Sequence, residues 1–398
     1  MIERKARAGN KRRGGKAASL GLAACVGLAI AGFSFGAPAQ QATQVLKLGS
    51  IGTTSGPNAS MGKEGLSGLE YGVRKVNAAG GVKIGGDSYT VQLVNLDDQS
   101  QAEKAVAAAE QLISSYKVPV IFGPPASTTT LAILPTVEKN KTLLMTFIAA
   151  APAIVDPGNS FSFRITINSL HDVYPSVEFI VKDRGAKNIA YLGRNDDWGR
   201  SAGKALAAKL QEMGAKLAVE DYFDPGTTDF YGLLSKVKSA NPDAVILSAI
   251  IEDGVPFIKQ YRELRIPAAV LNLGVIWASP NFLKAAGPAA EGAYVATAAQ
   301  TSDTPELRAF NEDFQKVMGT QSQTFDKSGY DAFTIVLEAM KKVGSTDPTK
   351  VRDMLLNFEY KGVLQTYRFA GTGQSEVVVN INQIKDGKLV VMKSTTTK

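Results

Sequence analysis

The chain has 398 residues, 44% of them hydrophobic and 20% charged, an ordinary globular composition with enough length for two compact units. Most of its formal charge of +7 lies in residues 1–39, where seven basic side chains stand against one acid. Because the rest of the chain is close to neutral, the composition argues against a nucleic-acid-binding protein.

Residues 1–39 have the pattern of an export signal. A basic start precedes an apolar run over about 17–35, and Ala37-Pro38-Ala39 supplies the small residues of a cleavage site. We therefore expect this segment to be a signal peptide and the mature protein to lie in the periplasm. A retained membrane anchor stays open as an alternative, although the run is rich in Gly and Ala and barely long enough to span a bilayer.

Two other processing routes also stay open. Leu22-Ala23-Ala24-Cys25 resembles a lipoprotein signal, in which Cys25 would carry the lipid, but only a short apolar run precedes it. Arg12-Arg13 would suit twin-arginine export, but Gly14-Gly15 follows where apolar residues are expected. Cys25 is the only cysteine, so cleavage after Ala39 leaves a protein without thiols, whose fold depends on its core.

From residue 45 onward, apolar strands alternate with amphipathic helices. The strands are predicted at 45–51, 89–96, 118–122, 143–148, 188–193 and 244–250, and the helices at about 62–78, 101–116, 199–213 and 254–264. This α/β alternation predicts parallel sheets that are covered by helices on both faces. Two such runs, divided near Ile165–Asn168, predict two similar α/β lobes.

In sheets of this kind, ligands bind at the loops that leave the carboxyl ends of the strands. These loops are predicted at 52–62, 123–130, 149–153, 194–199 and 250–254, and they are rich in Gly, Ser, Thr and other small residues. We therefore expect a binding site where these loops meet.

A run of hydroxyl side chains, Ser127, Thr128, Thr129 and Thr130, follows the buried strand at 118–122. A helix is expected to begin there, and the free N–H groups and partial positive charge of its N-terminus suit a ligand carboxylate. Capping of the helix by Ser127 is the alternative, but a cap needs one hydroxyl and not four. Pro135 lies within this expected helix and should end or bend it early.

Other candidates for chemistry are weak. His171 is the only histidine, and the sequence has neither a Gly-x-Ser-x-Gly motif nor a P-loop, so a hydrolase triad, a His/Cys zinc site and nucleotide binding are not expected. Asp97-Asp98 would suit a metal, but adjacent acids at a strand end more often cap the next helix. We expect no metal, no cofactor and no enzymatic activity. Trp198 and Tyr330 lie at helix starts, where each would either stack on a ligand or simply pack.

Seven segments, modest alone, occur in an order and spacing that together carry a resemblance. They are residues 48–82, 94–113, 120–133, 161–166 (FSFRIT), 195–201 (NDDWGRS), 289–295 (AAEGAYV) and 328–333 (SGYDAF). With them, nearly all of the mature chain resembles the periplasmic solute-binding proteins of the Leu/Ile/Val type, which serve ABC importers.

The resemblance implies a type I periplasmic-binding-protein fold, with two Rossmann-like lobes that close over a ligand. Three crossings, near residues 166, 296 and 376, would join the lobes and serve as hinges. The implied boundaries are 43–166 plus 297–376 for the N-lobe, and 167–296 plus 377–398 for the C-lobe.

The resemblance also implies which residues touch the ligand. Carried over residue by residue, they are Met61, Ser127 or Thr128 for the carboxylate, Ile148, Ala149, Ala150, Trp198 and Tyr330. Ala150 stands where the family usually has a hydroxyl, and Met61 where it has an aromatic ring.

The acid that would pair with the ammonium of an amino acid is missing from its implied place. That place is near Gly274–Ile276, where this chain has no carboxylate. Because a buried, unpaired ammonium would cost several kcal/mol, either Glu252 or Asp253 substitutes or the ligand has no ammonium. The residues expected to suit an apolar or aromatic carboxylic acid are Met61, Trp198, Ile250 and Trp277. A hydrophobic amino acid is the alternative ligand.

These implications favour the solute-binding subunit of an ABC importer. Such a protein captures a small carboxylate-bearing ligand and presents it to the transmembrane subunits of the permease. A ligand-sensing module for a signalling or chemotaxis receptor is the alternative, and an enzyme comes third. We expect a monomer with no nucleic-acid partner.

Overall fold

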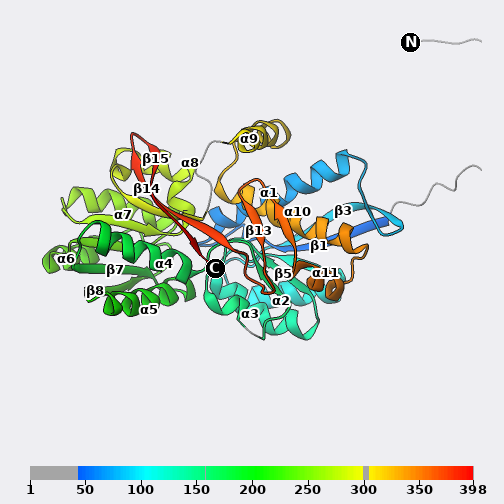
Figure 1. Ribbon diagram of the computed structural model, residues 1–398, viewed down its shortest axis with the longest axis horizontal. Helices are drawn as coiled ribbons and strands as arrows, with labels where there is room; N and C mark the ends of the chain where they lie inside the picture. The colour runs from blue at the N-terminus through cyan, green and yellow to red at the C-terminus, as the bar shows by residue number, and fades with distance from the viewer. Residues whose placement is uncertain (1–43, 157, 299–303, 398) are drawn as a thin grey trace, which may run out of the picture. The chain divides into compact units, whose positions relative to one another are not determined.

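The computed structural model describes residues 44–156, 158–298 and 304–397, which belong to one compact unit (Figure 1). The predicted signal peptide at 1–39 and the alternative lipidation site Cys25 lie outside the described residues. No helix within the described ranges is long and apolar enough to cross a membrane.

The first sheet has six strands in the order β2-β3-β1-β4-β5-β6. They are β1 (Gln44–Ile51), β2 (Val82–Ile84), β3 (Asp87–Leu96), β4 (Val120–Phe122), β5 (Leu143–Thr146) and β6 (Ser162–Arg164). The helices packed with it are α1 (Ala59–Ala78), α2 (Ala102–Ser114), α3 (Ser127–Lys139), α10 (Thr324–Val343) and α11 (Pro348–Leu355). Alternate residues of β4 show that both faces are covered, because Val120 and Phe122 pack with α10 whereas Ile121 packs with α2 and α3.

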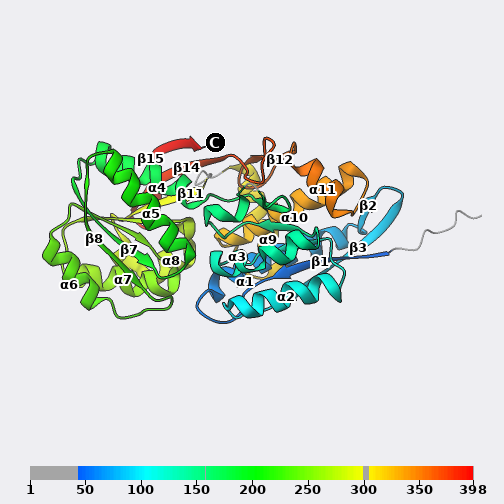
Figure 2. The same cartoon turned by 90° about the horizontal axis from the view of Figure 1, so that it is seen from below.

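The second sheet has seven strands in the order β15-β14-β11-β10-β9-β7-β8. They are β7 (Asn188–Arg194), β8 (Lys216–Phe223), β9 (Ala244–Ser248), β10 (Ala269–Leu273), β11 (Tyr294–Ala298), β14 (Val377–Lys385) and β15 (Lys388–Thr397). Its helices are α4 (Ser169–Glu178), α5 (Asp197–Glu212), α6 (Tyr231–Ala240), α7 (Ile251–Glu263) and α8 (Pro280–Ala286). Tyr191 of β7 packs with α4 and α5, and Leu192 packs with α6, α7 and α8. Helices α4 and α5 lie on the opposite face of this sheet from α6 and α7 (Figure 2).

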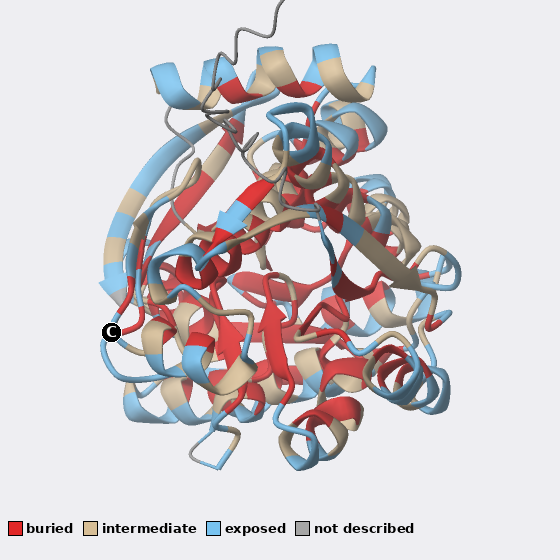
Figure 3. Ribbon diagram, turned by 90° about the vertical axis from the view of Figure 1, so that its right-hand side faces the viewer, coloured by how far each residue is buried: buried red, intermediate tan, exposed pale blue. Residues whose placement is uncertain are grey.

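The remaining elements are short or peripheral. They are α9 (Pro305–Met318), the pair β12 (Glu359–Lys361) and β13 (Thr366–Arg368), the π-helix η2 (Phe179–Asp183), and the 3-10 helices η1 (Pro152–Val155), η3 (Val275–Ala278) and η4 (Gly287–Ala290). Buried residues concentrate on the strands and on the sheet-facing sides of the helices, with exposed residues outside them (Figure 3).

The predicted alternation of strands and helices is found, but the sheets are not parallel throughout. β2 pairs antiparallel with β3, and β14 pairs antiparallel with both β11 and β15. Asp386-Gly387 joins β14 to β15 with positive φ at both residues, 50° and 67°. Asp-Gly between two apolar runs is a strong hairpin signal, so this departure was readable from the sequence.

Two of the crossings between the sheets lie side by side. Residues 165–168 lead from β6 to α4, and residues 369–376 lead from β13 to β14. The Arg164 N–H donates to Gly373 O at 2.7 Å, and the Gln374 side chain donates to Thr166 O at 2.9 Å. The lobe boundaries drawn from the sequence stay a prediction, although the two sheets draw on the halves of the chain that it assigned.

Helices α1 and α10, which carry residues to the binding site, pack closely where α1 has a glycine. A Cβ at Gly68 would lie 1.9 Å from the backbone oxygen of Asp326. We predict that Gly68→Ala lowers the free energy of unfolding by about 1–3 kcal/mol, because the helices must separate. Gly232→Ala in α6 is the control, since nothing lies within 4 Å of its Cβ. Chemical denaturation of both variants is the measurement, and equal stability would contradict the prediction.

Candidate functional site

Loops from the carboxyl ends of both sheets enclose a cavity of about 580 Å³, part of it open to solvent. Seven of the ten residues proposed from the sequence line it, and they are Met61, Ser127, Ile148, Ala149, Ala150, Trp198 and Ile250. The structure therefore brings most of the proposed binding residues to one place, which we call the central cavity.

The hydroxyl side chains at the start of α3 do not all make the same kind of contact. The alternative interpretation, in which Ser127 caps the helix, is wrong. The Ser127 Oγ instead accepts from the N–H groups of Ala150 and Ala151, at 3.2 and 3.0 Å. Thr129 and Thr130 donate back to the Ala126 carbonyl, at 3.2 and 2.8 Å. The two bonds to Ser127 hold the loop after β5 against the start of α3, whereas those of Thr129 and Thr130 stay within the first turn of the helix.

The start of α3 retains capacity for an anion. The first intrahelical N–H bond runs from Thr130 to Ala126, so the N–H groups of the preceding turn have no helical partner. The Ser127 hydroxyl accepts two hydrogen bonds and keeps its proton for a ligand oxygen. Ser127 lines the central cavity, so both features are available to a carboxylate there.

Pro135 does not end α3, contrary to the expectation from the sequence. The helix continues to Lys139, although Pro135 lacks an N–H to extend the ladder. Packing stabilises the turn around Pro135, because Leu134 and Val137 are buried against α2 and the sheet. Tertiary packing therefore outweighs the cost of the missing hydrogen bond.

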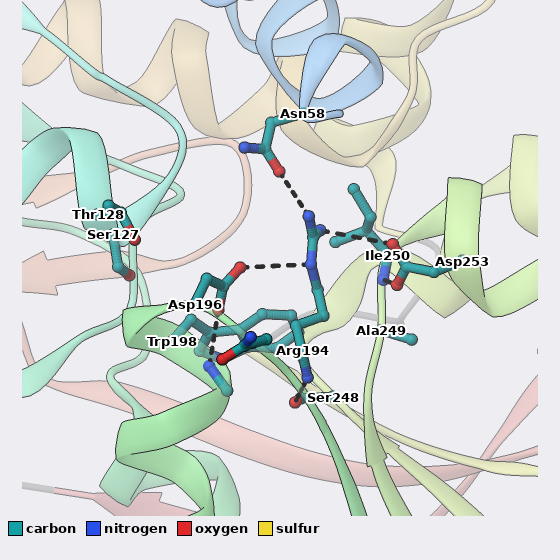
Figure 4. A network of polar contacts seen from close by, with 12 residues as sticks. Asn58, Ser127, Thr128, Arg194, Asp196, Trp198, Ser248, Ala249, Ile250 and Asp253 are labelled. Carbon is teal, nitrogen blue, oxygen red and sulfur yellow. Dashed lines mark hydrogen bonds and ion pairs between the residues drawn. The ribbon is translucent and has the colours of Figure 1, made fainter. Parts of the chain in front are cut away.

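A buried arginine at the end of β7 joins the two lobes, and the sequence interpretation missed it. Arg194 is 1% exposed and donates through Nη2 to Asn58 Oδ1 at 3.0 Å (Figure 4). Its Nε lies 3.3 Å from Asp196 Oδ2, and its Nη1 lies 3.7 Å from Asp253 Oδ1. A basic residue directly after an apolar strand, at the start of the predicted loop at 194–199, was the sequence feature that could have pointed to it.

Besides facing Arg194, Asp253 makes a contact within its own helix start. It caps the start of α7, where its Oδ2 accepts from the Ile250 N–H at 3.0 Å. Burial raises the pKa of Asp253 to about 6, and the Arg194 charge opposes that rise. Asp253 is thus already engaged with Arg194 and the helix start, and it does not line the central cavity.

Asp172 is the second residue that the sequence interpretation missed. It lies in the first turn of α4, is 0% exposed, and lines the central cavity. Neither carboxyl oxygen has a hydrogen-bond partner of good geometry. Burial raises the pKa of Asp172 to about 8, and the nearby backbone N–H of Gly274 only partly opposes it.

Trp198 also lines the central cavity. Its ring packs against Gly274, whose φ is +79°, and a Cβ at Gly274 would lie 3.1 Å from Trp198 Cζ2. The backbone conformation therefore favours glycine there, and any larger residue would also press on the Trp198 ring.

Three proposed residues lie outside the lining of the central cavity. Thr128 Oγ1 accepts from the Asp197 N–H at 3.3 Å, so it contacts the other lobe. Trp277 is fully buried, stacked on Phe282 with a centroid distance of 4.5 Å. Tyr330 packs in an aromatic cluster with Tyr71 at 5.1 Å. Glu252, offered as a substitute acid, does not line the cavity either.

The other sequence candidates have structural contacts. Asp97-Asp98 does not cap α2, whose N-cap is Gln101 without a side-chain bond. Instead, Asp97 accepts from the Thr54 N–H at 2.9 Å and Asp98 from the Thr53 hydroxyl at 2.6 Å, which fastens the loop after β1. His171 is half-buried beside Arg164, and burial together with that charge lowers its pKa to about 4. No cluster of three metal-ligating residues occurs in the described parts of the chain.

The profile of the periplasmic binding protein family matches residues 45–388. The chain belongs to this family. Leu/Ile/Val-binding protein homolog 7 of Brucella abortus (strain 2308) is 28% identical over 387 residues, covering 92% of this chain and 95% of that protein. The resemblance to the Leu/Ile/Val type is confirmed. The family is one of solute-binding proteins rather than enzymes, and it implies an extracytoplasmic location.

Solved structures of periplasmic binding proteins confirm the predicted fold. The branched-chain amino acid binding protein LivJ of Streptococcus pneumoniae, in complex with isoleucine, has a TM-score of 0.78 and 20% identity, covering 89% of this chain and 100% of that one. A solute-binding protein of Rhodopseudomonas palustris BisB5, in complex with 3,4-dihydroxybenzoic acid, has a TM-score of 0.79 and 21% identity, covering 88% and 97%. This periplasmic binding protein therefore shares its fold with proteins of both ligand classes.

The buried acid Asp172 gives the stability of the empty protein a defined pH dependence. Its pKa in the folded protein, about 8, lies above its ordinary value of 3.8, so the folded state holds a proton that the unfolded chain releases. We predict that Asp172→Asn stabilises the ligand-free protein increasingly as the pH rises from about 4 to 8, by up to about 1.4 kcal/mol per pH unit.

Chemical denaturation at pH 5, 7 and 9 measures this advantage, which should level off above pH 8. Asp353→Asn, at an exposed position of α11, is the control and should show no such trend. An advantage of Asp172→Asn that is the same at every pH would contradict the prediction.

Proposed function

We propose that the protein is the periplasmic solute-binding subunit of an ABC importer, which captures a small ligand with a carboxylate and an apolar body. The observation that carries this proposal is the central cavity, where the start of α3 offers donors and the remaining walls are mainly apolar. The proposed partners are the transmembrane subunits of a permease, and the proposed state is a monomer.

The cavity suits the two ends of such a ligand. The N–H groups at the start of α3 and the Ser127 hydroxyl would hold the carboxylate without a lysine or arginine. Met61, Ile148 and Trp198 would cover the apolar body. Arg194 is less suited to the carboxylate, because its guanidinium already faces Asn58, Asp196 and Asp253.

Capture would depend on lobe closure. The lobes touch each other around the cavity through Arg194 with Asn58 and through the Asp197 N–H with Thr128. Hinge movement at the crossings would open these contacts, and ligand would shift the equilibrium toward the closed form that a permease recognises. The sensing alternative would use the same clamp, but two proteins that share the fold, from Streptococcus pneumoniae and Rhodopseudomonas palustris, are solute-binding proteins of transporters, which favours transport.

A thermal-shift screen tests the proposed ligand class. The panel contains amino acids, benzoate- and cinnamate-like acids, fatty acids and amides. Each compound is added separately to the purified protein, expressed from the full-length chain. A true ligand at 100 times its Kd stabilises the folded state by about 2.7 kcal/mol. We expect hits among hydrophobic amino acids or apolar acids and none among amides. A protein stabilised by none of the carboxylates would contradict the proposed function.

The role of the Trp198 ring is tested by truncation. Trp198→Ala should weaken binding of the best hit by about 1–3 kcal/mol, because a large apolar contact is lost. Tyr231→Ala is the matched control, since Tyr231 is 44% exposed and outside the cavity. Titration calorimetry measures both variants, and an unchanged affinity would remove Trp198 from the site.

A further inference from the structure

We propose that the protein has a second binding site, beside the crossings between its two sheets, where Arg164, Ser162 and His171 hold a small monoanion of the carboxylate class. The site lies in a cavity of about 1800 Å³, part of it open to solvent. Residues of η1, β6, the start of α4 and the crossing at 369–376 line this cavity, which we call the crossing cavity. None of the described residues lines both the crossing cavity and the central cavity.

Arg164, the last residue of β6, is a buried cation whose hydrogen bonds all go to neutral groups. Its side chain is 0% exposed, and it donates through Nε to Gln374 Oε1 and through Nη1 to Ala151 O, both at 2.7 Å. Among the described residues, Nη2 has no hydrogen-bond partner and the guanidinium forms no ion pair. Burial lowers the pKa of Arg164 to about 9, against the opposing charge of Asp156, so the side chain is still charged at neutral pH.

The other buried arginine, Arg194, shows what Arg164 lacks. Arg194 is 1% exposed, and the carboxylates of Asp196 and Asp253 lie 3.3 and 3.7 Å from its guanidinium. Arg164 is buried to the same extent without such a countercharge. A buried charge without an ionic partner is costly. Water can complete the hydrogen bonds of a guanidinium, but only an anion balances its charge.

The hydroxyl of Ser162 is a second donor at the crossing cavity. Ser162 lies two residues before Arg164 on β6, so both side chains leave the strand on the same face. Both residues line the crossing cavity. The Ser162 side chain is 1% exposed, and its Oγ has no partner among the described residues. Its proton is therefore available to an acceptor in the cavity.

The imidazole of His171 supplies a third donor, and its surroundings fix which nitrogen carries the proton. Asn168 Oδ1 accepts from the N–H groups of Leu170 and His171, which turns the Asn168 amide nitrogen toward His171 Nε2, at 3.3 Å. Because that amide nitrogen can only donate, Nε2 accepts and the proton of the neutral ring lies on Nδ1. His171 Nδ1 is buried and has no partner in the described parts of the chain, and the residue lines the crossing cavity.

The charges of the lining favour an anion with a single negative charge. Besides Arg164, the charged residues of the crossing cavity are Asp156, Glu376 and Arg352. Glu376 and Arg352 are each engaged in an ion pair with another side chain. A monoanion balances Arg164, whereas a dianion would add a second negative charge beside two acids. A carboxylate also has two oxygens, and each accepts up to two hydrogen bonds, which is enough for the three kinds of donor.

The three donors come from both sheets. Ser162 and Arg164 belong to β6 of the first sheet, and His171 belongs to α4, which packs on the second. The backbone of Arg164 also holds the crossing at 369–376, since its N–H donates to Gly373 O at 2.7 Å and its carbonyl accepts from the Ser375 N–H at 2.9 Å. An anion bound by all three side chains therefore contacts both lobes beside two of their connections.

Nuclear magnetic resonance of the imidazole tests the site directly. His171 is the only histidine, so a protein without a histidine tag gives one set of imidazole signals. Sodium acetate, titrated at pH 8 against sodium chloride at constant ionic strength, should shift these signals to a plateau. Inorganic phosphate, mainly a dianion at this pH, should bind more weakly than acetate. A signal that acetate does not move, or moves without saturation, would overturn the inference, and so would tighter binding of phosphate.

Two serine variants show whether acetate binds in the crossing cavity. Ser162→Ala removes a hydroxyl that has no partner in the described protein, so it should leave the fold intact and weaken acetate binding by about tenfold, the effect of losing one hydrogen bond to a charged group. Ser176→Ala is the matched control, because Ser176 is equally buried and without a partner among the described residues but lies outside the crossing cavity. It should leave the affinity unchanged.

Removal of the cation completes the test. Arg164→Gln should weaken acetate binding by about thirty-fold or more, because the bound carboxylate loses its countercharge. The serine pair decides the question if Arg164→Gln does not fold. An acetate affinity that is the same in Ser162→Ala and Ser176→Ala would place the anion elsewhere and overturn the inference. The proposed function would stand in either case, since none of the three residues lines the central cavity.

Discussion

The buried guanidinium of Arg194 is the interaction on which the geometry of the central cavity depends. Arginine remains charged in proteins, so its burial is tolerated only where acceptors surround it. Asn58 from the first lobe accepts a hydrogen bond from it, and the carboxylates of Asp196, in the loop after β7, and Asp253, at the start of α7, lie 3.3 and 3.7 Å away as ion-pair partners. Satisfying one charge therefore fixes three chain segments, and the lining residues next to them are positioned as a consequence.

The hydroxyl run at the start of α3 shows how much of the site was readable from the sequence. Its position after a buried strand predicted the place of the cavity, because the carboxyl ends of parallel strands share one edge of a sheet. The individual roles were not readable, since Ser127 bonds to the loop after β5 and Thr128 to the other lobe. Those partners are distant in sequence, and only the folded chain brings them together.

The residues that the sequence interpretation missed or misplaced have a common explanation. Asp172 lies in the first turn of a helix, and Trp277 lies in a short 3-10 helix. Neither local sequence indicates where the side chain points. Periodicity cannot distinguish a side chain directed at a cavity from one directed at a core. The alternation of strands and helices, by contrast, depends on local pattern alone, and it was predicted well except at the antiparallel edges.

Residues from both lobes line the central cavity, so a ligand bound there can contact both lobes at once. The start of α3 belongs to the first lobe, whereas Asp172 belongs to the second. The direct contacts between the lobes include long hydrogen bonds, such as Asp197 N–H to Thr128 at 3.3 Å and Asn281 to Glu64 at 3.5 Å, and these add little stability on their own. A ligand that engages only one lobe leaves closure to those contacts and to the hydrogen bond between Arg194 and Asn58. A ligand whose two ends are bound by different lobes contributes binding energy that exists only in the closed form, and such differential binding is what shifts the equilibrium toward it.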